Sequence, residues 1–272
     1  MIARSASPTP ESLAWRRDGV VPLRGLIGGD WLDLMREAAW EIRDEVASRT
    51  PDKVTADEQI QSDFFTCLDL WMMNDKVSRF MRESRLAEVA ASVMESEEIR
   101  LYHDILIVKD QIVEQPTPWH QDEPSWEAVG SQLCGIWFSL DPVTEETASL
   151  RFVRSSHKGP RYSHPKVLCG AKMDLEREGG PLPDVDADPE RYPVVSYDLE
   201  AGDAVLFHPS MLHSSLGCKR EGPRISYAFR MMGDDVRWTP CPSSIHACGE
   251  ELRFEPGDRL IADRFPLLWQ NG

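Results

Sequence analysis

The sequence has no long apolar run and no cluster of basic residues. No stretch approaches the roughly 20 apolar residues of a membrane helix, and the opening MIARSASPTPESLAWRRDG contains no signal-peptide core. Lysine and arginine number 30 against 46 aspartates and glutamates, which gives a formal net charge of −16. A chain this acidic is poorly suited to neutralise nucleic-acid phosphates or to dock on an anionic membrane. We therefore expect a cytoplasmic protein with neither a nucleic-acid nor a membrane partner.

Cysteine is also sparse, and no two cysteines form a CxxC pair. The six thiols are widely spaced in a chain of 272 residues, at Cys67, Cys134, Cys169, Cys218, Cys241 and Cys248. This pattern is typical of reduced, buried cysteines, and it argues against a disulfide scaffold or a zinc ribbon.

Helical periodicity is confined mainly to the first hundred residues. Apolar side chains recur at helical spacing over residues 29–49, and Asp30 is the expected N-cap. A second amphipathic helix is predicted from about Asp75 to Ser96, capped by Asn74 or by Asp75 itself. Each helix has one apolar face and therefore needs a partner surface.

Strands are expected to supply that surface. Six short runs are rich in β-branched and aromatic residues and are separated by proline, glycine and acidic turns: 99–109, 133–140, 149–154, 193–199, 204–208 and 224–231. No helix-length pattern lies between them, which disfavours parallel βαβ winding. We expect an antiparallel sandwich or small barrel with helices packed outside.

The chain is expected to form a single domain over residues 1–272. Residues 1–98 form its mainly helical flank, 99–235 its β core, and 236–272 a C-terminal segment that packs on the core. Within the core, residues 159–192 hold five prolines and many charges, and this insertion is far longer than the usual connection. We interpret it as a partial lid over a site, with a solvated loop as the alternative.

A metal site is suggested by the motif PTPWHQDEP, which contains His120 and Asp122. Residues two apart in an extended segment point to one face, so this imidazole and carboxylate can bind one ion. The best candidate for a third ligand is His213, 91 residues further on, with His208 as the alternative. Two histidines and a carboxylate leave three positions open on Fe(II), the arrangement of non-haem oxygenases.

An anion site is suggested by Arg224, eleven residues after His213, with Ser226 on the same face of the strand. A guanidinium beside a hydroxyl is well matched to the far carboxylate of a dicarboxylate such as 2-oxoglutarate. The near carboxylate and the keto oxygen of that molecule could then chelate the metal, which leaves one position for dioxygen.

In these motifs and their order, the chain resembles the phytanoyl-CoA dioxygenase family of Fe(II)/2-oxoglutarate oxygenases. The resemblance spans about residues 99–269 and is carried by DILIVKDQIVEQPTPWHQDEPSW, GIWFSLDPVTEETASLRFVRSSHKG, LEAGDAVLFHPSMLHSS, GPRISYAFR and EPGDRLIADRFPLLW. It departs from the family at residues 146–149 and 155–157, where turn residues differ. These differences bear on local backbone geometry and not on a ligand.

The resemblance implies a mainly β fold with flanking α-helices. This is a double-stranded β-helix, also called a jelly roll or cupin-like fold, with the N-terminal helices packed on its major sheet. It implies Fe(II) as the metal, with 2-oxoglutarate and O2 as co-substrates. The implied iron ligands are His120, Asp122 and His213, and Arg224 is the implied anchor for the carboxylate of 2-oxoglutarate.

Further residues are expected near this centre. By resemblance, Trp137 lies near 2-oxoglutarate and Ser215 supplies a hydroxyl. Trp126 is the tryptophan most plausible at the pocket mouth, and His103 is a second candidate for substrate contact, with a core role as the alternative. Lys109 resembles a basic position that lies before the metal loop, with an exposed charge at a strand end as the alternative.

We therefore predict a 2-oxoglutarate-dependent dioxygenase that hydroxylates a small molecule, such as a natural product, lipid or amino-acid-like compound, with release of succinate and CO2. The retained Asp122 favours oxygen transfer over halogenation. Two alternatives remain, a cupin-type metal-dependent isomerase or lyase and a non-catalytic ligand-binding β-sandwich. The identity of the substrate and the oligomeric state are not readable from the sequence.

Overall fold

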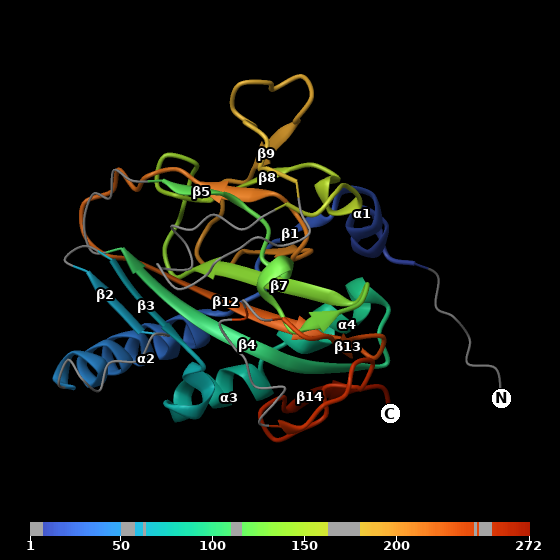
Figure 1. Ribbon diagram of the computed structural model, residues 1–272. Coiled ribbons are helices and arrows are strands. Elements are labelled where there is room, and N and C mark those ends of the chain that lie inside the picture. Colours follow the sequence, from blue (N-terminus) through green and yellow to red (C-terminus); the bar gives the residue numbers. More distant parts are fainter. Residues whose placement is uncertain are drawn as a thin grey trace.

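The computed structural model describes residues 8–49, 58–61, 64–109, 116–162, 180–241, 244 and 252–272. Two antiparallel sheets face one another, and a layer of helices covers the outer side of the larger sheet (Figure 1). Among these described residues, no helix is long and apolar enough to cross a membrane. Half of the insertion at 159–192, residues 163–179, lies outside them, so its interpretation as a lid stays a prediction.

The larger sheet contains eight strands. Its order is β1 (Val20–Leu23), β10 (Ala204–Phe207), β7 (Leu133–Ser139), β12 (Arg224–Met232), β4 (Glu98–Lys109), β3 (Phe64–Leu68) and β2 (Glu58–Gln61), while β14 (Leu267–Gln270) also pairs with β4. The predicted strands at 99–109, 133–140, 204–208 and 224–231 are confirmed here within one or two residues.

The smaller sheet has the order β5 (Thr117–His120), β11 (His213–Ser215), β8 (Leu150–Val153) and β9 (Val194–Ser196). From β4 to β12 the chain passes repeatedly between this sheet and the four central strands of the larger one. That course, with helices outside, is the predicted double-stranded β-helix. A separate two-stranded sheet joins β6 (Ala128–Val129) to β13 (Arg237–Trp238).

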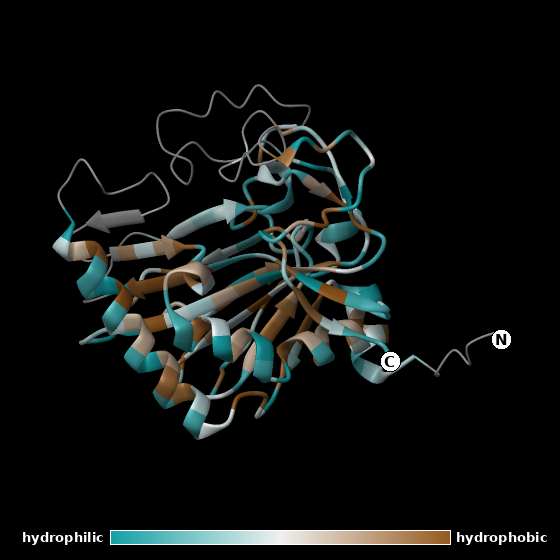
Figure 2. Cartoon of the chain, turned by 90° about the horizontal axis from the view of Figure 1, so that it is seen from below, coloured by the Kyte–Doolittle hydropathy of each residue, from teal (hydrophilic) through white to brown (hydrophobic). Residues whose placement is uncertain are grey.

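The helical layer consists of α2 (Gly29–Ser48), α3 (Asp75–Glu83) and α4 (Leu86–Met94), with α1 (Pro10–Asp18) against α4 and β1. Seen from below, these helices lie across the strands of the larger sheet (Figure 2). Their apolar residues join one continuous core with the outward-facing side chains of that sheet. The partner surface that the amphipathic pattern required is therefore the larger sheet.

The helix boundaries differ from the sequence prediction in three places. The N-cap of α2 is Gly28, without a side-chain hydrogen bond, and Asp30 lies in the first turn. The helix expected from Asp75 to Ser96 is two helices, because Ser84 adopts an extended backbone with ψ of 169°. Its Asn74 cap is confirmed, since the side chain accepts from the backbone N–H groups of the first turn. Helix α1 was not predicted.

Strand β12 has a buried apolar cluster on each of its two faces. Alternate residues from Ile225 to Met231 belong to the core between the larger sheet and the helices. The residues between them, from Arg224 to Arg230, lie on the opposite face, where Ala228 joins a second apolar cluster between the two sheets. The sequence of β12 thus supports the helical layer with one set of side chains and faces the smaller sheet with the other.

Described parts of the C-terminal segment contact the β core. Phe265 stacks on Tyr102 with ring centroids 5.8 Å apart, and β14 pairs with β4. The four cysteines among the described residues, Cys67, Cys134, Cys218 and Cys241, are buried thiols; Cys169 and Cys248 lie outside the described residues.

Phe80 ties the helical layer to the larger sheet. It is fully buried in α3, with its ring 5.6 Å from Phe138 of β7 and 5.5 Å from Phe229 of β12. Because Phe80→Ala would leave a cavity at this junction, we expect it to lower the free energy of unfolding by about 3–5 kcal/mol. Urea unfolding measures the change. The control Leu13→Ala, at a side chain 52% exposed, should change it by less than about 0.5 kcal/mol, and equal effects would contradict the packing argument.

Candidate active site

Three potential metal ligands come together at one end of the space between the sheets. His120 ends β5 and His213 begins β11, and the two are directly paired across these strands. Asp122 follows β5 immediately before a short 3₁₀ turn. Its Oδ1 atom lies 3.4 Å from Nε2 of His120 and 3.6 Å from Nε2 of His213. The structure thus brings together the three residues that the sequence selected as metal ligands.

Both imidazoles are held in one orientation by the backbone. Nδ1 of His120 lies 2.8 Å from the carbonyl oxygen of Pro118, and Nδ1 of His213 lies 3.0 Å from that of Met211. A carbonyl can only accept, so Nδ1 carries the proton and Nε2 presents its lone pair. Burial, with His120 nearby, lowers the pKa of His213 to about 3. His213 is therefore neutral at physiological pH, as a metal ligand must be.

Asp122 remains ionised although it is buried. Burial by itself would raise its pKa, but the Arg230 guanidinium, followed by His213 and His120, holds the pKa of this carboxyl well below its usual range. Nη2 of Arg230 lies 2.8 Å from Oδ2 of Asp122 in an ion pair. The carboxylate charge is therefore available to a cation on its Oδ1 side.

The donor set fits an Fe(II) ion. Cis ligands about 2.1 Å from one ion stand ~3 Å apart, close to the 3.4 and 3.6 Å separations of Oδ1 from the two nitrogens. Two imidazoles and one carboxylate are the ligand types that such an ion takes with open positions remaining.

A second cluster contains two buried cations on the same inner face of the larger sheet. Arg224 and Lys109 are directly paired across β12 and β4, and are 2% and 3% exposed. Nε of Arg224 and Nζ of Lys109 have no hydrogen-bond partner, and among the described residues neither cation has a carboxylate in ion-pair distance. Burying cations without a counter-charge is unfavourable, so this cluster is suited to an anionic ligand.

Two of the other expected co-substrate residues, Ser226 and Trp137, lie beside Arg224, whereas Ser215 lies in the smaller sheet. Arg224 donates a hydrogen bond of 3.1 Å to the hydroxyl of Ser226, and its guanidinium carbon lies 5.7 Å from the ring centre of Trp137. The hydroxyl of Ser215 donates to that of Thr117 at 3.0 Å, across β11 and β5. Ser226 therefore orients the guanidinium, and Trp137 forms an apolar wall beside it.

The remaining candidates occupy other surroundings. His208 lies against Trp15, with ring centroids 5.4 Å apart, and does not belong to the metal-ligand group. His103 and Trp126 contact one another edge to face, at 5.5 Å. Trp126 is only 3% exposed and packs in an apolar cluster with Phe265. Substrate contact by His103 or Trp126 stays a prediction.

Sequence reasoning left the role of Lys109 open and missed Arg230. The alternative of an exposed charge is wrong for Lys109, which is buried in a strand paired with β3 and β12 on either side. Arg230 is six residues after Arg224, an even number, which places both on one face of a strand. That spacing was the signal available for Arg230.

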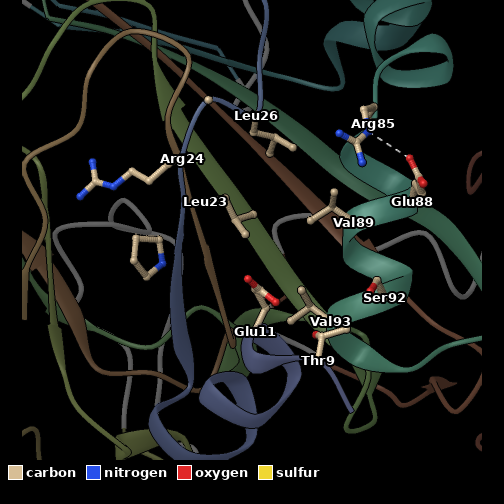
Figure 3. A pocket seen from close by; sticks show the side chains of 12 residues that line it. Thr9, Glu11, Leu23, Arg24, Leu26, Arg85, Glu88, Val89, Ser92 and Val93 are labelled. Atoms are coloured by element: carbon tan, nitrogen blue, oxygen red, sulfur yellow. Dashed lines mark hydrogen bonds and ion pairs between the residues drawn. The ribbon is translucent and has the colours of Figure 1, made fainter. Parts of the chain in front are cut away.

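A separate hollow of about 510 Å³ lies between α1, β1 and α4 (Figure 3). Apolar residues such as Leu23 and Val93 line it beside the Arg85–Glu88 ion pair. None of its twelve lining residues belongs to the metal-ligand group or to the Arg224 cluster. This hollow is therefore separate from the candidate site between the sheets.

Sequence comparison gives a family match over most of the chain. The model of the phytanoyl-CoA dioxygenase (PhyH) family matches residues 15–226. A probable phytanoyl-CoA dioxygenase of Caenorhabditis elegans is 27% identical over 120 residues, which are 44% of this chain and 37% of that protein. The match thus spans little more than a third of that relative's length.

Several solved structures share the fold. The non-heme alpha ketoglutarate dependent carbocyclase SnoK from nogalamycin biosynthesis is 20% identical with a TM-score of 0.72, covering 97% of this chain and 100% of that one. The epimerase SnoN from the same biosynthesis is 21% identical with a TM-score of 0.70, covering 95% and 97%. EctD from S. alaskensis, solved with 2-oxoglutarate and 5-hydroxyectoine, is 18% identical with a TM-score of 0.69, covering 91% and 83%. At these identities the likeness establishes the double-stranded β-helix alone.

Proposed function

This chain belongs to the phytanoyl-CoA dioxygenase family, and we propose that it is an Fe(II)- and 2-oxoglutarate-dependent dioxygenase that hydroxylates a small organic molecule. One observation carries the proposal: a two-histidine, one-carboxylate donor set lies between the two sheets with a pair of buried cations that have no carboxylate in ion-pair distance within the described part of the chain. The first matches a metal and the second a dicarboxylate.

Each residue of the site has a proposed task. His120, Asp122 and His213 hold Fe(II), which supplies the activation of dioxygen coupled to oxidation of 2-oxoglutarate to succinate and CO2. Arg224 and Lys109 bind the far carboxylate of 2-oxoglutarate and fix its position relative to the three ligands. Ser226 orients Arg224, and Trp137 excludes water from the ion pair. Water exclusion strengthens that pair.

The fate of the substrate is the finer part of the proposal. Similar structures include an epimerase and a carbocyclase as well as EctD solved with a hydroxylated compound, so one fold accommodates several outcomes. Hydroxylation is the outcome we propose, and the retained carboxylate of Asp122 favours it over halogenation alone. A product that gains one oxygen atom distinguishes hydroxylation from ring closure or epimerisation by mass.

The direct test is release of succinate from 2-oxoglutarate, measured anaerobically and in air with Fe(II), ascorbate and a library of small organic molecules. We expect succinate only in air, and more of it when a substrate is present. A protein that binds Fe(II) but never consumes 2-oxoglutarate would favour the cupin-type isomerase or lyase, and one that binds neither would favour the ligand-binding β-sandwich.

Lys109 gives the proposal a pH dependence. Burial, with a smaller contribution from Arg224, lowers the pKa of Lys109 to about 8. As the pH rises through this value the charged form is lost, and only that form attracts a dicarboxylate. Affinity for 2-oxoglutarate should therefore fall above about pH 8, approaching tenfold per pH unit.

Two variants of Lys109 separate this effect from other titrations. Arginine stays charged throughout, so Lys109→Arg should bind 2-oxoglutarate with little change between pH 7 and 9, whereas Lys109→Met should bind weakly and with equally little change. Equilibrium binding to Co(II)-loaded protein measures both. Retention of the wild-type pH slope in Lys109→Met would show that Lys109 is not the titrating group.

A further inference from the structure

Arg230 occupies the inner face of the larger sheet, between the metal-ligand group and the strands. It lies in β12 and is directly paired with Gly135 of β7 and with His103 of β4. Its side chain is 11% exposed, and its guanidinium carbon lies 5.1 Å from the ring centre of Phe207. A charged group held this deep requires a specific counter-charge, and Asp122 supplies it.

Gly135 makes the space for this guanidinium. A Cβ atom at position 135 would stand 2.7 Å from Nη1 of Arg230 and 3.0 Å from the Phe207 ring. The other residues of β7 have side chains and are fully or nearly fully buried. A glycine inside such a strand marks a close approach by another group. Two strands are therefore shaped around the position of Arg230.

The two oxygens of Asp122 have different neighbours. Oδ2 forms the 2.8 Å ion pair with Arg230, whereas Oδ1 faces the Nε2 atoms of His120 and His213 at 3.4 and 3.6 Å. The carboxylate is thus fixed in rotation, with one oxygen committed to Arg230 and the other directed at the imidazole nitrogens.

We propose that Arg230 is a positioning residue that makes Asp122 a one-oxygen metal ligand, with Gly135 as the gap that admits it. The inference rests on the proposed function. A carboxylate that can turn or bind through both oxygens takes a second coordination position, and this chemistry needs positions for 2-oxoglutarate and dioxygen. Arg230 prevents that by holding Oδ2 away from the ion.

The test uses Arg230→Gln and Gly135→Ala, which disturb the same ion pair from two strands. Substitution of a residue that holds a metal ligand in place typically weakens metal binding about 10–100-fold. We expect both variants, prepared without metal, to bind Co(II) more weakly than the wild type by a factor in this range. We also expect an altered Co(II) ligand-field spectrum, which responds to coordination number. Arg230→Lys, which keeps the charge, should fall between these variants and the wild type.

Arg36→Gln is the matched control, because it removes another partly buried arginine paired with an aspartate, Asp141, at 3.1 Å. It should leave Co(II) affinity and spectrum unchanged. If the wild type binds Co(II) and 2-oxoglutarate but Arg230→Gln and Gly135→Ala keep its affinity and spectrum, the positioning role is wrong and the proposed function stands. If the wild type itself binds neither, the proposed function fails.

Discussion

Asp122→Ala is expected to abolish tight Fe(II) binding and, with it, consumption of 2-oxoglutarate. Loss of the carboxylate leaves only the two imidazoles as ligands. We expect metal affinity to fall by more than about 100-fold, the upper range for changes to residues that contact a metal ligand. The variant also leaves the Arg230 guanidinium buried without its partner. Breaking a buried ion pair in this way costs about 3–5 kcal/mol of unfolding free energy.

The double variant Asp122→Ala/Arg230→Met separates the two effects. Removing both charges should restore most of the lost stability, measured by urea unfolding of the metal-free proteins, because no unpaired charge remains. Fe(II) binding, measured anaerobically by equilibrium dialysis, should stay absent. Wild-type metal affinity in Asp122→Ala would refute the ligand assignment. Failure of the double variant to regain stability would mean that Asp122 supports the fold through other contacts.

Arg224→Met is expected to have the second largest effect, on 2-oxoglutarate. Truncating one partner of a buried charge pair typically costs about 2–5 kcal/mol, which corresponds to roughly 30-fold to several-thousand-fold weaker binding. Metal affinity should change little, since Arg224 contacts none of the three ligands. Equilibrium binding of 2-oxoglutarate and of Co(II) to the same protein measures the two effects separately.

The same substitution should act in the opposite direction on stability. Without 2-oxoglutarate, Arg224 and the neighbouring Lys109 are two buried cations with no counter-charge among the described residues. Their repulsion and desolvation are relieved in Arg224→Met, so its ligand-free form should melt at a higher temperature than the wild type. Arg85→Met, at an exposed arginine just before α4, should change neither melting temperature nor 2-oxoglutarate affinity. A destabilised Arg224→Met that still binds 2-oxoglutarate would contradict both expectations.

The parts of the fold predicted from sequence are those in which local pattern and packing agree. The long strands around Ile107, Ile136 and Tyr227 are rich in β-formers and are also buried on both faces. Strands β5 and β11 were not predicted, although they carry His120 and His213, because four and three residues hold too little pattern. Strand β1 contains Pro22, which is a poor strand signal outside an edge position.

The helix that proved to be two helices has a different explanation. The apolar spacing runs on past Arg82 to Leu86, so periodicity gives no sign of an end. The extended backbone of Ser84 lets Phe80 of α3 and the apolar face of α4 both reach the larger sheet. Tertiary packing overrode a sequence that is compatible with one continuous helix.

The parts of the site that short sequence spacings indicate could be predicted without knowledge of the fold. Arg224 and Ser226 are two residues apart in β12, where alternation places both side chains on one face. His120 and Asp122 have the same spacing, but β5 ends at His120 and Asp122 has helical backbone angles, so the extended segment expected for this pair is not found although the two side chains do meet. The burial of Lys109 depends on β3 and β12, which lie far from it in sequence. The ion pair of Arg230 with Asp122 likewise joins residues brought together only by the closed pair of sheets.

Strand β12 has one consequence for how the protein loses activity. Arg224 and Arg230 alternate along it with Tyr227 and Phe229, which anchor the helical layer. Heating that loosens the helices must therefore displace the arginines as well, so inactivation on a temperature ramp should coincide with the loss of helical circular dichroism. By the same reasoning, an insertion of one residue in β12 would turn every side chain beyond it to the opposite face of the sheet. We therefore expect new substrate preferences to arise by exchange of surface loops and not by insertion in this strand.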